Sequence, residues 1–249
     1  MSRLASLGIS IAERGWVPES LMSLVVRLSC RNRLIHINRT FQNDPESVHR
    51  AFLNRLEQAA IAEATTEANE QHYELPAEFF GYALGTHRKY SGCEWTEGTS
   101  TLDEAEAEAL ETIVERARLS EAKSILELGC GWGSLSLFMA QRFPNTPITV
   151  ISNSSGQQQY IQAEAKRRNL PNLTVIRADI NSFQPHTRFD RIVTVEMLEH
   201  VRNYRALFAR IAGWLEPDGL LFIHIFRHLK YPYTFETEGT ANWMGRHFF

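Results

Sequence analysis

Residues 124–133 read Ser124-Ile-Leu-Glu127-Leu-Gly129-Cys-Gly131-Trp-Gly133, and this stretch decides the fold. The apolar run Ser124–Leu128 predicts a short buried strand, and a helix is expected to begin near Ser134. Glycines between a strand and a helix let the backbone turn sharply and approach a ligand where a side chain would clash. We therefore expect a ligand-binding loop at the carboxyl end of a parallel strand.

Four more apolar, mostly β-branched runs follow, at Ile148–Ser152, Leu173–Arg177, Phe189–Val195 and Leu220–Phe226. Amphipathic helical segments separate them. Near-continuous apolar strands that alternate with helices are typical of a parallel sheet covered on both faces. The predicted fold class is α/β, a Rossmann-like doubly wound parallel sheet with five visible strands.

The chain before Thr101 predicts helices and no strand. A helical pattern follows Pro18, and Asp44-Pro45 has the N-cap and first-turn proline of a second helix, expected to run to about Ala64. The capping-box spacing of Thr101 and Glu104 begins an acidic helix that runs to about Arg118. The predicted organisation is an N-terminal helical cap, residues 1–101, and a Rossmann-like domain, residues 102–249.

The composition is that of a globular protein. The chain has 249 residues, 43% hydrophobic and 22% charged, and a formal net charge of −3, which argues against a nucleic-acid-binding surface over the whole molecule. We find no apolar stretch of the roughly 20 residues that span a bilayer and no signal-peptide core. The three cysteines have no metal-binding spacing, so free thiols and a cytoplasmic location are expected.

The spacing of the glycines bears on the ligand. Gly129, Gly131 and Gly133 form G-x-G-x-G, whereas dinucleotide-binding proteins use G-x-G-x-x-G. The second strand ends in Ser152-Asn153, where such a protein places a ribose-binding acid. Both observations disfavour NAD. A plain tight turn without a ligand is the alternative.

Polar residues also follow the second and third strands. Asn153 and Gln157 lie beyond the second strand, and Asp179 and Ile180 lie beyond the third. Amides can hydrogen-bond ribose hydroxyls, and an aspartate can accept from an adenine amino group. Each alone reads as a surface polar residue, but their shared place at successive strand ends predicts a nucleoside site.

At this point the motifs resemble a class I S-adenosylmethionine-dependent methyltransferase, of the group that contains cyclopropane-fatty-acid synthases and plant coclaurine N-methyltransferases. The resemblance spans about Phe79 to Phe249, and the glycine before Cys93 and the Asn153/Gln157 pair favour the coclaurine branch. The residues that carry it are Lys89-Tyr-Ser-Gly-Cys-Glu-Trp95, Ser100-Thr-Leu-Asp-Glu-Ala-Glu106, Ile125–Gly133, Ser152-Asn-Ser-Ser-Gly-Gln157, Val195-Glu-Met-Leu-Glu-His200 and Leu221-Phe-Ile-His-Ile225.

The resemblance implies S-adenosylmethionine as cofactor and assigns roles along the chain. The methionine part would be held by Glu127, Gly129 and Gly131, the ribose by Asn153 and Gln157, and the adenine by Asp179 and Ile180. The cover over the sulfonium would include Tyr90, Ser91 and Thr101, and the set of cofactor-binding residues also includes Val195.

Catalytic candidates follow the fourth strand. Methyl transfer is an in-line displacement, so the protein mainly aligns the nucleophile and excludes water. An amine must be neutral to attack, so a nearby base helps. By resemblance to the N-methyltransferases, Glu196 and His200 would bind or deprotonate the amine, beside Glu199. If this turn is helical, positions 196 and 200 share one face.

The cyclopropane branch implies a different use of the site. There a bicarbonate ion removes a proton after methyl addition to an alkene, and Cys93, Glu199 and His224 fall at positions that resemble its holders. A histidine inside an apolar strand is otherwise a core residue, and a free cysteine is commonly a small buried apolar group. Adjacent Glu199 and His200 make a poor metal site, so no metal is expected.

Two features at the ends of the chain lead to further expectations. The sequence stops some twenty residues after the fifth strand, so we expect the family's last antiparallel strand pair to be missing. Basic residues dominate the N-terminal stretch and allow weak contact with an anionic membrane surface, although a solvated arginine face over a small helical cap is the favoured interpretation. They are Arg3, Arg14, Arg27, Arg31, Arg33 and Arg39.

The sequence thus predicts S-adenosylmethionine-dependent methylation of a small molecule, at an amine. One alternative is methyl or methylene transfer to unsaturated lipid acyl chains, as in cyclopropane-fatty-acid synthases. Another is a non-catalytic cofactor-binding protein, motivated by the missing C-terminal strands. The sequence leaves the methyl acceptor and the oligomeric state open.

Overall fold

The computed structural model describes residues 3–63 and 76–232 of the chain. It divides the chain into two compact units, residues 57–227 and residues 1–56 together with 228–249. The latter contains α1 (Arg3–Glu13), α2 (Glu19–Asn43) and most of α3 (Pro45–Gln58). Within it, the Tyr231 hydroxyl donates to the Asn38 side-chain oxygen at 2.6 Å.

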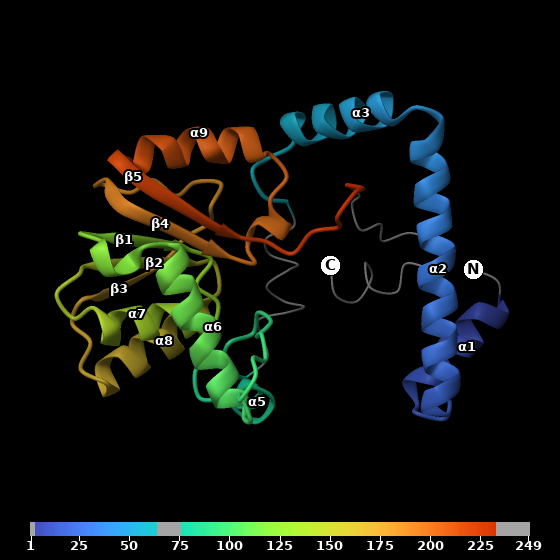
Figure 1. Ribbon diagram of the computed structural model, residues 1–249, viewed down its shortest axis with the longest axis horizontal. Coiled ribbons are helices and arrows are strands. Elements are labelled where there is room, and N and C mark those ends of the chain that lie inside the picture. The colour runs from blue at the N-terminus through green and yellow to red at the C-terminus, as the bar shows by residue number, and fades with distance from the viewer. Residues whose placement is uncertain (1–2, 64–75, 233–249) are drawn as a thin grey trace. The chain divides into compact units, whose positions relative to one another are not determined.

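The unit 57–227 is built on one sheet of five parallel strands in the order β3-β2-β1-β4-β5 (Figure 1). The strands are β1 (Ile125–Leu128), β2 (Ile148–Ser152), β3 (Leu173–Arg177), β4 (Phe189–Val195) and β5 (Leu215–His224). This order reverses direction at β1, as in a doubly wound sheet, and it confirms the predicted fold class.

The fifth strand begins earlier than the sequence predicts. Leu215 already pairs with Phe189, and the regular ladder resumes where Leu220 pairs with Arg191. The residues between, Glu216-Pro-Asp-Gly219, produce a shift in register, and Asp218 has a φ of +66°. Because Pro and Gly interrupt the apolar run, the sequence pattern predicts only the second part of this strand.

Helices cover both faces of the sheet (Figure 1). Alternate strand residues point to opposite faces, so Ile125 joins one core cluster and Leu126 joins another. The first cluster includes side chains of α6 (Leu102–Arg116), α7 (Ser134–Arg142) and α8 (Ser155–Arg167). The second includes side chains of α9 (Tyr204–Trp214). Burial on both faces explains why the strands are apolar throughout.

The helix α3 ends at Gln58, before the predicted end near Ala64, which lies outside the described residues. Tertiary hydrogen bonds explain the early end. The Asn181 amide bonds both backbone groups of Ala62, at 3.0 Å each, and the Ile61 carbonyl accepts from the Arg202 N–H. These contacts take the backbone groups that a longer helix would need.

The predicted capping box of α6 is confirmed. The Thr101 hydroxyl accepts from the Glu104 N–H, and the Glu104 carboxylate accepts from the Thr101 N–H at 3.0 Å. A short helix, α5 (Ala77–Ala83), precedes the segment that leads to this cap. Residues 57–101 group with the sheet. The predicted division into a helical cap, residues 1–101, and a cofactor-binding domain, residues 102–249, stays a prediction.

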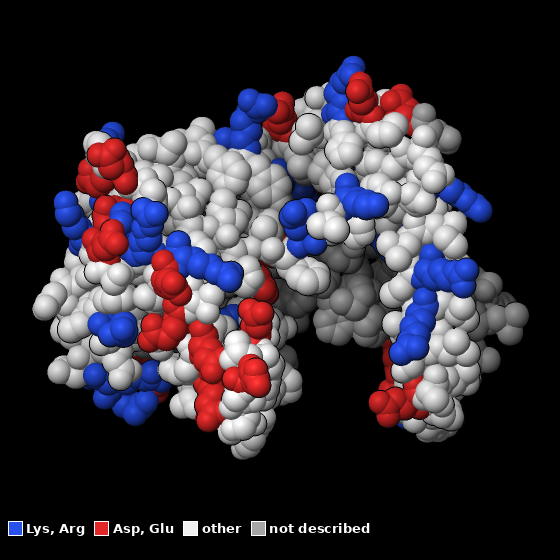
Figure 2. Space-filling model, viewed as in Figure 1, with Lys and Arg blue, Asp and Glu red and all other residues white. Residues whose placement is uncertain are grey.

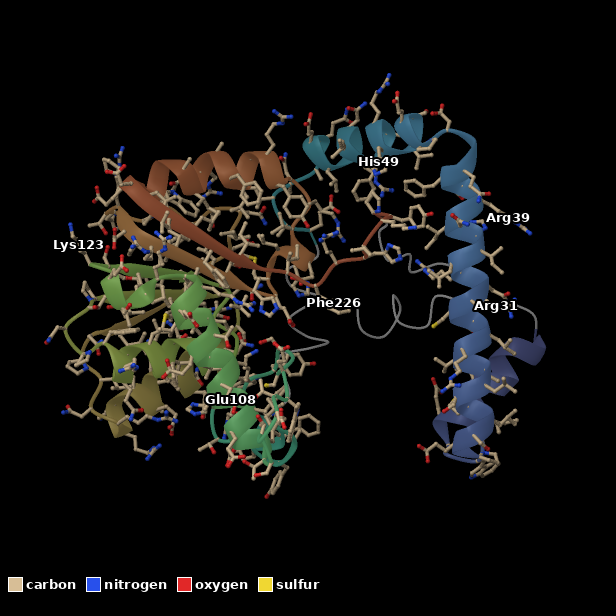
Figure 3. All side chains as sticks on the ribbon, viewed as in Figure 1. Arg31, Arg39, His49, Glu108, Lys123 and Phe226 are labelled. Atoms are coloured by element: carbon tan, nitrogen blue, oxygen red, sulfur yellow. The ribbon has the colours of Figure 1, made fainter. Side chains whose placement is uncertain are left out.

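No helix among the described residues is long and apolar enough to cross a membrane. Of the N-terminal arginines, Arg14, Arg27, Arg31 and Arg39 are exposed, and Figure 3 labels Arg31 and Arg39 on α2. Their predicted contact with a membrane surface remains a prediction.

Candidate functional site

The glycine loop joins β1 to α7, and its three glycines all have positive φ values. They are +78° at Gly129, +52° at Gly131 and +80° at Gly133. A Cβ on Gly129 would meet the Met197 side chain at 2.5 Å, and one on Gly133 would meet Ile161 at 2.7 Å. A Cβ on Gly131 would meet nothing within 4 Å. Two glycines therefore allow close packing, and the third borders open space.

Glu127 lies on β1, two residues before the loop, and is only 3% exposed. The Ser136 hydroxyl donates to its Oε2 at 2.5 Å. Burial raises the pKa of Glu127 from 4.5 to about 7, and the Ser136 hydrogen bond offsets part of that shift. A carboxyl group in this state ionises readily when a cation is placed beside it.

The end of β2 presents an amide at the same edge of the sheet. The Ser152 hydroxyl donates to Gln157 Oε1 at 2.6 Å, and the Gln157 N–H donates to Ser154 Oγ. The Nε2 group of Gln157 is buried, with no hydrogen-bond partner among the described residues. A buried unsatisfied donor is costly, so this group is suited to a ligand oxygen. Asn153 is half-buried beside it.

Beyond β3, the predicted adenine residues have local structural roles as well. One oxygen of Asp179 accepts from the Asn181 N–H at 2.8 Å and from the Asn181 side chain at 3.0 Å. Ile180 is buried in the core cluster that includes Ile151 and Phe183. The Asp179 side chain therefore shapes a turn, as Asx side chains commonly do.

Carboxylates of α6 hold the segment that contains Tyr90, Ser91 and Thr101. Figure 2 shows acidic side chains gathered over this helix, and Figure 3 labels Glu108 on it. Glu106 is fully buried and accepts backbone N–H groups of Gly85, His87 and Lys89. Asp103 accepts from Thr86, and Glu108 accepts from the hydroxyls of Thr96 and Thr99. The acidic character of α6 thus orders the preceding segment.

Aromatic rings dock the same segment on the glycine loop. Phe80, from α5, lies 4.8 Å from Trp132, centroid to centroid, and 5.7 Å from Tyr90. Trp132 is 3% exposed and also contacts Tyr160 of α8. Because Trp132 lies between Gly131 and Gly133, the position of the segment is tied to the position of the loop.

Two strand ends bring the catalytic candidates together. Glu196 follows β4 and its N–H donates to the carbonyl of His224, the last residue of β5. His224 Nε2 lies 4.0 Å from Glu196 Oε1. Glu196 has a φ of +48°, a conformation that costs a non-glycine residue energy and is commonest at functional sites. The sequence left His224 as either a core residue or a residue of the site. In the structure its ring is half-buried and lies beside a carboxylate.

Glu199 and His200 lie in a short 3-10 helix, η2 (Leu198–His200). The premise of a helical turn from 196 to 200 is not met, because the backbone of Glu196 is left-handed. Glu199 Oε1 accepts from the Phe226 N–H, and its Oε2 is buried with no hydrogen-bond partner in the described part of the chain. Burial raises the pKa of Glu199, and the nearby Glu196 raises it further. The His200 N–H donates to the Met197 carbonyl.

Two further candidates and one unpredicted residue complete the site. Val195 ends β4, half-buried, and pairs in register with His224. Cys93 is half-buried, and burial raises the pKa of its thiol, which Glu196 raises further and Lys89 opposes. The sequence showed Lys89 only as part of a motif. Its 4% exposure and the effect of the Glu196 charge on its pKa come from the structure.

The described residues contain no group of three or more His, Cys, Asp or Glu that could hold a metal ion. The arrangement offers instead an open glycine loop, a buried acid and a free amide donor on one side. On the other side it offers two carboxylates and an imidazole. Such a site can bind a polar ligand with a positive charge and accept a proton from a second molecule beside it.

The chain is similar to known proteins over most of its length. The family model of mycolic acid cyclopropane synthetase matches residues 61–249. (S)-Coclaurine N-methyltransferase of Thalictrum flavum subsp. glaucum is 33% identical over 237 residues, which cover 95% of this chain and 66% of that protein. Cyclopropane-fatty-acyl-phospholipid synthase of Escherichia coli (strain K12) is 31% identical over 157 residues, 62% of this chain and 39% of that protein.

A solved structure resembles nearly the whole chain. It is coclaurine N-methyltransferase bound to N-methylheliamine and SAH, with a TM-score of 0.86 and 33% identity. The match covers 98% of this chain and 70% of that one. The chain therefore spans about two thirds of the length of the N-methyltransferases it matches.

Proposed function

The chain belongs to the mycolic acid cyclopropane synthetase family of S-adenosylmethionine-dependent methyltransferases, and on that premise we propose that it transfers a methyl group from S-adenosylmethionine to the nitrogen of a small amine. One observation carries the proposal. The open glycine loop after β1 and the Glu196–His224 pair after β4 and β5 lie at the same edge of the sheet. A cofactor site and a proton acceptor are thus side by side.

The residues at the first of these sites fit the cofactor. The open space at Gly131 admits its methionine part, the buried acid Glu127 suits the ammonium group, and the free donor of Gln157 suits a ribose oxygen. Further residues of the proposed cofactor site are Gly129, Asn153, Asp179, Ile180, Val195, Tyr90, Ser91 and Thr101. When bound, the cofactor supplies a methyl group made electrophilic by the neighbouring sulfonium charge.

The acceptor side has to deliver a neutral amine. A protonated amine has no lone pair to attack with, so Glu196 or His224 would take its proton first. The amine nitrogen then forms a bond to the methyl carbon while the bond from that carbon to sulfur breaks. Glu199 and His200 would line the same space, and the segment that carries Tyr90 and Ser91 would exclude water.

A second candidate function is supported by the cluster of Cys93, Glu199 and His224. The charge of Glu196 raises the pKa of both Cys93 and Glu199, and that of His224 lowers the pKa of Glu199. By the family resemblance these residues would hold a bicarbonate ion, which removes a proton after methyl addition to an unsaturated acyl chain. The similarity to a cyclopropane-fatty-acyl-phospholipid synthase, over 62% of this chain, supports it.

Isothermal titration with S-adenosylmethionine, with NAD as the control, tests the cofactor. Binding of the first alone supports the proposal, and no binding by the folded protein refutes it. Mass spectrometry with amine panels and with alkene phospholipids then tests the acceptor. A gain of one methyl group on an amine supports N-methylation, and a gain on the phospholipid supports the second candidate. Cofactor binding without turnover on either panel would favour a non-catalytic protein.

The remaining proposals concern place and partners. We expect a cytoplasmic protein that binds no nucleic acid, and weak contact of the N-terminal arginines with anionic membranes. Co-sedimentation with anionic liposomes, compared at low and high salt, tests the membrane contact, since electrostatic binding to a surface weakens as salt screens it.

A further inference from the structure

Lys89 is a buried lysine, 4% exposed, whose side chain turns forward along its own chain. Its ammonium group donates to the Ser91 carbonyl at 3.2 Å, to Ser91 Oγ at 2.5 Å and to the Gly92 carbonyl at 2.8 Å. An ammonium group has three hydrogens and no acceptor. The three hydrogens are all used within the chain, so Lys89 does not serve as a donor to a substrate.

The backbone of Lys89 is fixed independently of its side chain. Its N–H donates to Glu106 Oε1 at 3.1 Å, and the same carboxylate holds the N–H groups of Gly85 and His87. Glu106 belongs to α6, which packs in the core through Leu110 and Ile113. Lys89 thus transmits the position of a rigid helix to the residues that follow it.

Lys89 and Cys93 interact electrostatically with the catalytic candidate Glu196. The charges of Cys93 and Glu196 both act on Lys89, and the charges of Lys89, Glu106 and Glu196 all act on Cys93. Burial lowers the pKa of Lys89, while Cys93, Glu196 and Glu106 oppose that effect. A cation beside Glu196 disfavours a second positive charge in the same space, so it favours the neutral form of an amine there.

We propose that Lys89 is a positioning residue, which holds Tyr90–Cys93 beside Glu196 through three hydrogen bonds and supplies a fixed positive charge to the acceptor side of the site. The inference rests on the proposed methyl transfer. It extends that function by identifying the Lys89 side chain as the group that keeps Tyr90–Cys93 in place. It also makes Cys93 a reporter, because the thiol senses both the charge of Lys89 and the position of the segment.

The test alkylates Cys93 with iodoacetamide across a range of pH in the 249-residue chain with Cys30→Ser, since Cys30 is exposed and Cys130 is buried. The pH profile gives an apparent thiol pKa and a limiting rate separately. In Lys89→Met we expect a higher pKa, because a nearby cation is lost, and a several-fold higher limiting rate, because the segment is released.

Lys123→Met is the matched control, since it removes the same charge from an exposed lysine just before β1. Lys123 and Phe226 lie at opposite ends of the sheet (Figure 3). The control should keep the parent's profile. If Lys89→Met does not fold, Ser91→Ala removes one of the three acceptors, and its limiting rate should rise while the charge of Lys89 stays.

Turnover gives the second readout. With an amine that the parent methylates, Lys89→Met should lower kcat by about a hundredfold through misplacement of the segment, with a smaller change in cofactor affinity. A folded Lys89→Met protein with an unchanged alkylation profile and an unchanged kcat overturns the inference. If the parent methylates no amine, the proposed function fails, whereas the alkylation profile still decides the role of Lys89.

Discussion

Glu127→Gln should change how the stability of the cofactor-free protein depends on pH. Glu127 is buried, and its pKa is about 7 in the folded protein against an ordinary 4.5. The folded protein therefore binds this proton more tightly than the unfolded chain does. The stabilisation from the bound proton is fully present below pH 4.5 and is lost as the pH rises through about 7.

The size of the effect follows from the shift. A difference of 2.5 units, 7 minus 4.5, corresponds to about 3 kcal/mol at 1.36 kcal/mol per unit. Glutamine keeps the shape of the side chain and still accepts from Ser136, but it does not ionise. The free energy of unfolding of Glu127→Gln, minus that of the parent, should thus rise by about 3 kcal/mol between pH 4.5 and pH 8.

Urea unfolding of both proteins at half-unit steps of pH measures this difference, and other titrating groups cancel because the two proteins share them. A difference that stays constant across the range would refute the reasoning about burial. Cofactor binding should depend on pH in the opposite direction to stability. The parent's affinity for S-adenosylhomocysteine should increase several-fold from pH 6 to pH 7.5 as Glu127 ionises. The Glu127→Gln variant should bind S-adenosylhomocysteine weakly at every pH in this range.

Three other changes test the rest of the site. Gly131→Val strains a backbone with a φ of +52°, although a Cβ there meets nothing within 4 Å, and the folded variant should show no cofactor binding by titration calorimetry; unchanged affinity in a folded variant would remove the loop from the site. Glu196→Gln should keep cofactor affinity and lower kcat by about 10²–10³, as for loss of a general base; a fully active variant would exclude that role. Glu106→Gln should cost about 2 kcal/mol in urea unfolding, because its amide cannot accept all three backbone N–H groups. Glu108→Gln, which affects only exposed contacts to one oxygen, should cost much less; equal losses would argue against the role of Glu106.

Much of the fold could be predicted from the sequence because the relevant signals are local. A strand that is buried on both faces must be apolar throughout, and a glycine with positive φ is a property of the loop itself. The run 124–133 therefore predicts a strand, a turn and a helix in the right order. The capping box at Thr101 is likewise contained within four residues.

Features of the structure that depend on residues distant along the chain were not predicted from the sequence. The early end of α3 depends on Asn181, which lies 119 residues from Ala62 along the chain. The left-handed backbone of Glu196 and its pairing with His224 depend on how β4 and β5 align.

The sequence showed α6 only as an acidic helix, whereas in the structure Glu106 is fully buried and holds three N–H groups. The sequence by itself determined which residues are chemically able to bind and to accept protons, because side-chain chemistry is local. Only the tertiary structure decided which of them meet and which are buried, because the distances and the local dielectric that govern charge depend on the folded chain.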